Sequence, residues 1–358
     1  MVKYNLVYGE LSYQATDKWA LTLGARYYEY DLWSKSANHA PFYDGEIASV
    51  NNLDYTTLTA DGDGSLFKFN TSYQFNEDVM TYFTVSEGFR LGGANSLPLC
   101  DGSTQVCALP SEQSYNPDTT VNTELGIKST WFSNRLHLNA AIFNVDWEDA
   151  QIEAASVNGS EAITLNAGAA NSKGFEFSAR AMITDSIIAY ATYSFAKAEL
   201  TEDSPALFGT QDNSDYQSFY DGSDGDRLPG APEQQISFGL NYETEILEDK
   251  ILNINYGLTA QSDVYTKVGL KDDGEILPGF ALSNLSAKLS DDSWSVTLYV
   301  DNLFDKYAFT SVRRDKTWNG QAKFAGNNKA LPELQRVYGH YTTKPRTIGL
   351  RFNYNFEL

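Results

Sequence analysis

The chain has 358 residues and a formal net charge of -21, because 47 acidic residues outnumber 26 Lys and Arg. This acidic balance argues against a nucleic acid as partner. No run of about 18 or more apolar residues occurs, which excludes a helical membrane protein. Aromatic residues make up 14% of the chain, which suits the interfacial girdles of a membrane β-barrel but also a β-rich soluble protein.

Apolar and polar residues alternate along most of the chain, and this period of two is typical of strands with one apolar and one polar face. The clearest segments, in chain order, are 19–28, 67–75, 121–131, 175–180, 236–243, 294–301 and 345–358. Segments 79–88 and 187–197 have apolar residues on both faces, so they predict strands without an orientation. The last segment alone would also fit an edge strand of a soluble sandwich, but the recurrence of the pattern favours a barrel.

The expected connections alternate in length. Short polar turns are expected at 15–18, 76–78, 133–134, 184–186, 248–249 and 290–293. Long loops are expected between them, at 32–63, 92–118, 153–170, 203–232, 266–277 and 311–344. Short turns on one rim and long loops on the other indicate a bacterial outer-membrane barrel, with the short set periplasmic and the long set outside.

The sequence therefore predicts an all-β fold, an antiparallel transmembrane β-barrel of about 13 strands ending at the C-terminal strand. A bacterial single-chain barrel normally has an even number of strands. The chain also opens at Met1-Val-Lys-Tyr4 directly into strand-like sequence, without the features of a signal peptide. We therefore expect further sequence upstream.

Seven stretches, in order along nearly the whole chain, carry a family resemblance. They are 21–27, Tyr82-Phe-Thr-Val-Ser-Glu-Gly-Phe-Arg-Leu-Gly-Gly-Ala-Asn95, 115–128, 166–177, Leu228-Pro-Gly-Ala-Pro232, Val300-Asp-Asn-Leu-Phe-Asp-Lys-Tyr307 and 345–350. Together they resemble the C-terminal part of the TonB-dependent outer-membrane receptors.

This resemblance implies a larger barrel of about 22 strands with an N-terminal plug that engages TonB. Residues 1–358 would form the C-terminal portion of the barrel domain, with the plug and the first strands missing. We expect a fragment of a longer polypeptide, rather than a truncated gene or one piece of a split receptor.

No catalytic arrangement is expected. The three histidines, His39, His137 and His340, are scattered along the sequence. Neither a phosphate-binding loop nor a dinucleotide fingerprint occurs. The sequence therefore predicts a protein that is not an enzyme and needs no cofactor.

Cys100 and Cys107 lie close together in one expected loop. In an oxidising compartment this spacing favours a disulfide that closes a small loop. A zinc site is the weaker alternative, since no histidine lies nearby in the sequence.

Two acidic clusters invite a calcium hypothesis. Residues 202–226 contain seven carboxylates without Lys or Arg, and Asp61-Gly-Asp-Gly64 is a smaller case. Clustered carboxylates with glycine turns are potential calcium ligands. The spacing matches no complete calcium loop, so solvated external loops are the favoured interpretation and no metal site is predicted.

The last long loop, 311–346, is basic and aromatic within this acidic chain. We expect Arg313, Arg314 and Arg336 to hold an anion and Trp318, Tyr338 and Tyr341 to offer stacking surfaces. An anionic, partly flat ligand would fit such a set. Contact with lipopolysaccharide phosphates, or pairing with the acidic loop, is the alternative interpretation.

The functional prediction follows from the resemblance. The protein would be an outer-membrane receptor of a Gram-negative bacterium that takes up a scarce bulky nutrient, gated by a plug and powered by the TonB complex. Ferric siderophores, glycan fragments and cobalamin are all possible ligands, and membrane lipid and lipopolysaccharide are expected contacts. A passive pore or a surface-exposed structural barrel is the alternative.

Overall fold

The computed structural model describes residues 2–37, 55–97, 99, 108–155, 162–166, 168–204, 222–246, 249–270, 274–314 and 338–356. Thirteen strands form one antiparallel sheet in which each strand pairs with the next in chain order. They are β1 (Val2–Thr16), β2 (Trp19–Ser36), β3 (Thr56–Asn76), β4 (Val79–Arg90), β7 (Asp118–Trp131), β8 (Leu136–Glu148), β11 (Ala170–Met182), β12 (Ile187–Leu200), β13 (Gln234–Ile246), β14 (Lys250–Gln261), β17 (Phe280–Ser290), β18 (Trp294–Asp301) and β21 (Thr347–Tyr354). The expected strand number is thus confirmed.

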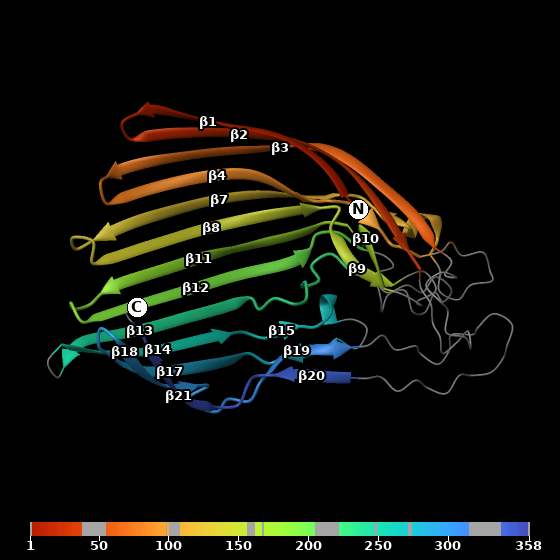
Figure 1. Cartoon of the computed structure of the whole chain (residues 1–358). Coiled ribbons are helices and arrows are strands. Elements are labelled where there is room, and N and C mark those ends of the chain that lie inside the picture. The colour runs from red at the N-terminus through yellow and green to blue at the C-terminus, as the bar shows by residue number, and fades with distance from the viewer. Residues whose placement is uncertain are drawn as a thin grey trace.

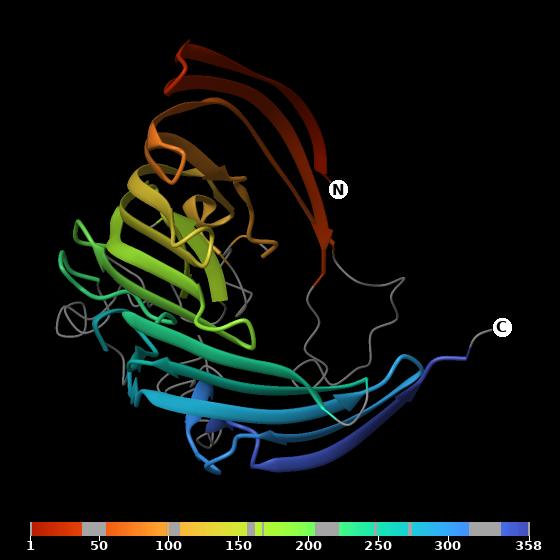
Figure 2. The same ribbon diagram turned by 90° about the vertical axis from the view of Figure 1, so that its left-hand side faces the viewer.

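The sheet curves into a trough with β1 and β21 at its two edges, so the barrel is partial in this chain (Figure 2). No helix in the described ranges is long and apolar enough to cross a membrane. The two helical segments are short 3-10 turns, η1 (Pro110–Glu112) and η2 (Val268–Leu270).

The short turns lie at one end of the sheet and the long connections at the other, as predicted (Figure 1). Four of the long connections contain a small two-stranded sheet of their own. These sheets pair β5 (Gly93–Ala94) with β6 (Ser114–Tyr115), β9 (Gln151–Ala155) with β10 (Ala162–Asn166), β15 (Val264–Tyr265) with β16 (Ile276–Leu277), and β19 (Phe309–Arg314) with β20 (Tyr338–Thr342).

The expected loop at 32–63 is wrong in its bounds. β2 continues to Ser36 and β3 already begins at Thr56, with Ser36 opposite Thr56 in the register. In this stretch the outward positions Glu29, Asp31, Asp61 and Asp63 are polar, so the apolar alternation that marks a membrane strand is lost although the backbone ladder continues. The sequence Asp61-Gly-Asp-Gly64 therefore lies inside a strand and forms no glycine turn.

The register carries the two faces across the whole sheet. One polar row runs from β7 to β14 through Lys128, Asn139, Ser178, Thr192, Ser237 and Thr259. One apolar row runs from β13 to β21 through Tyr242, Ile254, Ala287, Leu298 and Leu350. The faces predicted for single strands therefore join into one apolar and one polar surface, as expected of the lipid and lumen sides of a barrel.

Aromatic side chains of the apolar face gather at the short-turn end. Each lies within a few residues of a short turn: Trp19, Tyr73, Trp131, Tyr242, Trp294 and Tyr354. A ring of amphipathic aromatics at this level is typical of the interface between a membrane barrel and water. The short-turn rim thus has the composition expected at one boundary of the membrane.

Five tyrosines of the polar face lie directly opposite a glycine of the next strand. The pairs are Tyr28 with Gly64, Tyr30 with Gly62, Tyr82 with Gly126, Tyr190 with Gly239 and Tyr299 with Gly349. At each of these glycines an added Cβ would fall under 3.0 Å from the tyrosine ring. Each tyrosine ring covers the backbone of the opposite glycine, which has no side chain of its own to cover it. This packing fixes the register of the two strands. Tyr82 and Tyr190 also explain why 79–88 and 187–197 showed no clear orientation.

Candidate functional site

At the long-connection end of the sheet β3 and β4 separate, and the chain that follows β4 lies on the polar face beside this gap. The pairing of β3 with β4 ends at Lys68 and Ser86, while β2 and β3 stay paired beyond it. Above this gap Tyr28 stacks on Phe89, with ring centroids 3.7 Å apart. The Tyr30 hydroxyl accepts a hydrogen bond from the Gly92 amide at 3.0 Å. The chain after β4 therefore packs on the polar face.

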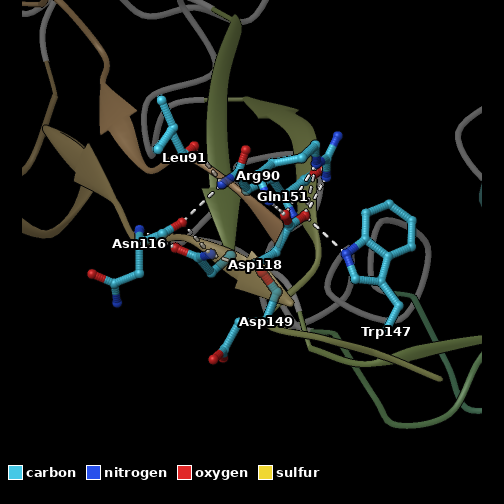
Figure 3. A network of polar contacts seen from close by, with 8 residues as sticks. Arg90, Leu91, Asn116, Asp118, Trp147, Asp149 and Gln151 are labelled. Atoms are coloured by element: carbon cyan, nitrogen blue, oxygen red, sulfur yellow. Dashed lines mark hydrogen bonds and ion pairs between the residues drawn. The ribbon is translucent and has the colours of Figure 1, made fainter. Parts of the chain in front are cut away.

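A buried carboxylate lies where this chain meets the sheet. Asp118, the first residue of β7, is 1% exposed. The Arg90 Nε donates to both carboxylate oxygens, at 3.1 and 2.9 Å. The Trp147 Nε1 donates to the same carboxylate at 2.8 Å, and the backbone N–H of Gln151 donates to it at 3.0 Å. Figure 3 shows Arg90, Trp147 and Gln151 converging on this group. The guanidinium carbon also lies 4.8 Å from the Trp147 ring centroid.

The electrostatics identify Asp118 as an anchor rather than a proton carrier. Burial raises the pKa of Asp118, but the hydrogen bonds from Arg90, Gln151 and Trp147 outweigh it and hold the pKa below its usual value. The hydrogen bond to Asp118 in turn raises the pKa of the Arg90 guanidinium. A carboxylate held this firmly in its charged form fixes geometry and supplies no acid–base chemistry.

Amide side chains join the long connections into one body. Asn95 bonds the backbone of Thr164 twice, accepting from its amide at 2.9 Å and donating to its carbonyl at 2.7 Å. Asn166 does the same to Asn116, at 2.7 and 3.0 Å. Each side-chain amide thereby makes the pair of hydrogen bonds that the backbone of a neighbouring strand would make. We refer to residues 91–97, 108–118, 149–155 and 162–166 as the mouth unit.

Gln151 fastens the mouth unit a second time. Its side-chain amide donates to the carbonyls of Leu91 and Asn116, both at 2.9 Å. A small apolar cluster supports the unit, formed by Leu97, Ala108 and Ile163 with Leu165 packed against it. The hairpins β5–β6 and β9–β10 are thus held against the wall by few but specific contacts.

A second anchor serves the connections further along the chain. Arg227 is largely buried and lies 3.0 Å from Asp263 and 3.5 Å from Glu233. Its guanidinium carbon is 4.4 Å from the Tyr265 ring centroid. Arg227 belongs to the connection between β12 and β13, whereas Asp263 and Tyr265 follow β14. Neighbouring connections are therefore joined by a buried charged group here as well, in this case a cation.

The predicted ligand-binding residues are partly described by the structure. Arg313 and Arg314 lie in β19 and Tyr338 and Tyr341 in β20, where Arg314 is opposite Tyr338 and Ser311 is opposite Tyr341. Trp318 and Arg336 lie outside the described residues. The side chain of Tyr341 is exposed.

The hairpin of β19 and β20 is fastened to the neighbouring connection by His340. The His340 Nε2 lies 3.1 Å from the Glu275 carboxylate, and its ring stacks on Phe309 with a centroid distance of 4.1 Å. His340 was expected in a loop, but it lies in β20. His137 lies in β8 opposite Thr130 and Arg180, and His39 is outside the described ranges.

Other sequence predictions remain partly outside the described residues. Cys100, Cys107 and residues 205–221 of the acidic loop are not described. At the base of that loop Asp203 and Asp226 accept backbone hydrogen bonds, at 3.0 Å from Asp224 and 2.8 Å from Ser223. Among the residues that the structure does describe, no group of three or more potential ligands could hold a metal ion.

No role was expected for Arg90, Asp118, Trp147 or Gln151 from the sequence. A usable signal was present, because Arg90 and Asp118 are opposite charges at the two strand ends that flank the connection 92–118. Pairing of β4 with β7 brings them together. The amide pairs of Asn95 and Asn166 had no such signal, since their partners Thr164 and Asn116 lie in stretches that were expected to be loops.

Comparison with known proteins places this architecture in a family. The family model of TonB dependent receptor-like β-barrels matches residues 2–303. The ferric-pyoverdine M114 receptor PbuA of Pseudomonas sp. (strain M114) is 26% identical over 299 residues, which are 83% of this chain and 32% of that protein. The probable siderophore receptor PiuA of Acinetobacter baumannii is 24% identical over 307 residues, 84% of this chain and 36% of that protein.

Solved structures share the fold. The ferric yersiniabactin uptake receptor FyuA of Yersinia pestis superimposes with a TM-score of 0.73 at 17% identity, over 99% of this chain and 46% of that one. The structure of PiuA from A. baumannii gives a TM-score of 0.68 at 20% identity, over 99% and 43%. The chain thus spans about a third of the length of the curated relatives. Because the family model covers most of its residues, the protein belongs to the TonB-dependent receptors and contributes part of their β-barrel.

Proposed function

We propose that the protein acts in the outer membrane as part of an energy-dependent uptake receptor for a scarce and bulky nutrient, and that this nutrient is a metal chelate of the siderophore class. The match of residues 2–303 to the family's barrel is the observation that carries the proposal. The names of the relatives support the ligand class, since PbuA is a ferric-pyoverdine receptor and FyuA a ferric yersiniabactin receptor. A plug and the TonB complex would supply gating and energy.

The mouth unit suits this function. A receptor that selects a rare ligand benefits from loops fixed in place before binding, because ordering them on binding would cost affinity. The bonds around Asp118 and the paired amides provide such order at the long-connection end, which is the outer end of a bacterial barrel.

The ligand contacts that we propose lie on the β19–β20 hairpin and the chain between its strands. Arg313, Arg314 and Arg336 would hold anionic groups, and Trp318, Tyr338 and Tyr341 would stack on flat parts of the ligand. Siderophore-type chelates often combine negative charge with flat donor groups, which fits such a set. A disulfide between Cys100 and Cys107 would brace the connection between β4 and β7, and residues 1–358 would form one barrel portion.

Uptake by the full-length receptor tests the proposal. The gene is deleted and restored in its own host, and import of labelled ferric siderophores is measured under iron limitation, with and without TonB. The proposal expects import of at least one chelate that needs both the gene and TonB. Import of a chelate that needs the gene but persists without TonB would instead indicate a passive pore. Entry of small solutes that likewise needs the gene but not TonB would rule out the receptor function.

A further inference from the structure

Trp147 lies on the polar face of the sheet, near the long-connection end of β8. Its register partner on β11 is Ala170, which is in turn opposite Leu200 of β12. The half-buried indole packs against the buried cluster of Ala170, Leu200 and Val268. Val268 belongs to η2, in the connection that follows β14. The indole is therefore part of a cluster that contains a residue from a distant connection.

The polar edge of the same indole belongs to the anchor of the mouth unit. Its Nε1 donates to Asp118 at 2.8 Å, and the Arg90 guanidinium carbon lies 4.8 Å from the ring centroid (Figure 3). Arg90 Nη2 also donates to the backbone carbonyl of Gln151 at 2.9 Å. The groups that hold the mouth unit thus also fix the position of the ring.

The connections on the cluster side form a second body. We refer to residues 225–230 and 263–270 as the Arg227 unit, because Arg227 joins the two segments through its ion pair with Asp263. The backbone supports this link, since the N–H of Gly230 donates to the carbonyl of Tyr265 at 2.9 Å.

The Arg227 unit contributes two apolar side chains to the surroundings of Trp147. Val268 is a buried member of the cluster, and Leu228 packs against it as Trp147 does. The indole accordingly contacts the mouth unit through its N–H and its ring face, and packs with residues of the Arg227 unit through the cluster. A side chain bound in this way loses contacts on one side when the other side moves away.

We propose that Trp147 couples the mouth unit to the Arg227 unit, so that a change which loosens one also loosens the other. If the mouth unit separates from the wall, Asp118 and Arg90 no longer fix the indole, and its turning away removes cover from Val268 and Leu228. The reverse holds when the Arg227 unit opens, because an energetic coupling between two sites is reciprocal.

The coupling has a consequence for uptake that rests on the proposed function. Glu275 lies in the same connection as Val268 and contacts His340 of β20, at 3.1 Å. The β19–β20 hairpin carries the ligand contacts proposed above. A ligand held there would therefore steady the Arg227 unit and, through Trp147, the mouth unit.

Hydrogen exchange of the ligand-free, full-length receptor in detergent, followed by mass spectrometry, tests the coupling. Arg227→Gln should speed exchange within its own unit and also in the β9–β10 hairpin of the mouth unit, by roughly fivefold or more. Asp118→Asn should have the reciprocal effect on residues 263–270. In a Trp147→Leu background each change should speed exchange only in the unit that carries it.

Val145→Ala is the matched control background. Val145 lies on the same strand and face, two residues nearer the short-turn end, in register with Asn122 and Ser172. Both cross effects should persist in it at full size. If Arg227→Gln does not fold, as fast exchange of the wall strands would show, Val268→Ala replaces it with the same expectations.

Two results would overturn the proposal. One is exchange that changes only in the altered unit although Trp147 is present. The other is a cross effect that keeps its full size in the Trp147→Leu background, because the wall rather than the indole would then carry it. No ligand enters the experiment, so a receptor that shows the coupling but imports nothing would refute only the proposed function.

Discussion

Replacing Gly126 by Ala should destabilise the barrel wall although it adds only one methyl group. The added Cβ would fall under 3.0 Å from the Tyr82 ring, so the ring must leave its place. Tyr82 would then lose its hydrogen bond to Glu124 and its contact with Lys128, whose ammonium lies 5.4 Å from the ring centroid. Overpacking of this kind costs about 1–3 kcal/mol. Urea unfolding of the full-length receptor in lipid vesicles, followed by tryptophan fluorescence, measures the change.

Gly257→Ala is the matched control. Gly257 lies in β14 on the same polar face, but an added Cβ there meets nothing within 4 Å. Because Ala costs less backbone entropy than Gly, this variant should be neutral or up to about 1 kcal/mol more stable. In a Tyr82→Ala background Gly126→Ala should lose its penalty as well. Equal destabilisation by the two alanine variants, or an unchanged penalty without the Tyr82 ring, would refute the role of the tyrosine–glycine pairs.

Three further changes test other parts of the structure. Asp118→Asn should loosen the mouth unit by about 1–3 kcal/mol, seen as faster proteolysis of its hairpins, and slower proteolysis would contradict the anchor. Because the pKa of Asp118 is lowered on folding, its contribution should be full above the unfolded value near 3.9 and fade as pH falls through the folded value. Leu350→Arg should cost about 2–4 kcal/mol at the bilayer midplane, whereas Asn353→Arg on the polar face should be milder, and equal damage would undermine the assignment of faces. Arg313→Ala with Arg314→Ala should reduce uptake roughly tenfold at equal surface expression, and undiminished uptake would remove this hairpin from the binding site.

The wall of the barrel was predictable because hydrophobic alternation and turn spacing act within single segments. Leu298 and Leu350 were placed on the apolar face from their own strands, and the register then brought them side by side. Tyr82 and Tyr190 broke the pattern because their rings lie on the polar face over Gly126 and Gly239. A tyrosine that covers a glycine is favourable only once the neighbouring strand is in register, and that information is absent from the segment itself.

The mouth was predictable only in outline. A long connection was expected at 92–118, but its hairpin and η1 were not. The contacts that hold it are single side chains bonded to backbone that is distant in sequence, such as Asn95 to Thr164, 69 residues apart. No periodicity marks a residue of that kind. The basic stretch at 311–346 was visible from composition, yet composition could not show that Arg314 and Tyr338 would occupy opposite positions in a hairpin.

The mouth unit and the wall are stabilised in different ways, and the difference suits an uptake receptor. A wall strand forms a continuous backbone ladder with each neighbour, as the full register of β11 with β8 and β12 shows. The mouth unit has a buried apolar cluster of only three residues and depends on hydrogen bonds that each contribute about 0.5–1.5 kcal/mol. It can therefore separate from the wall at a far lower free energy than the wall unfolds. Since Asp118 begins β7 and also receives the bonds of Arg90 and Gln151, we expect it to set how firmly the mouth unit is held to the wall.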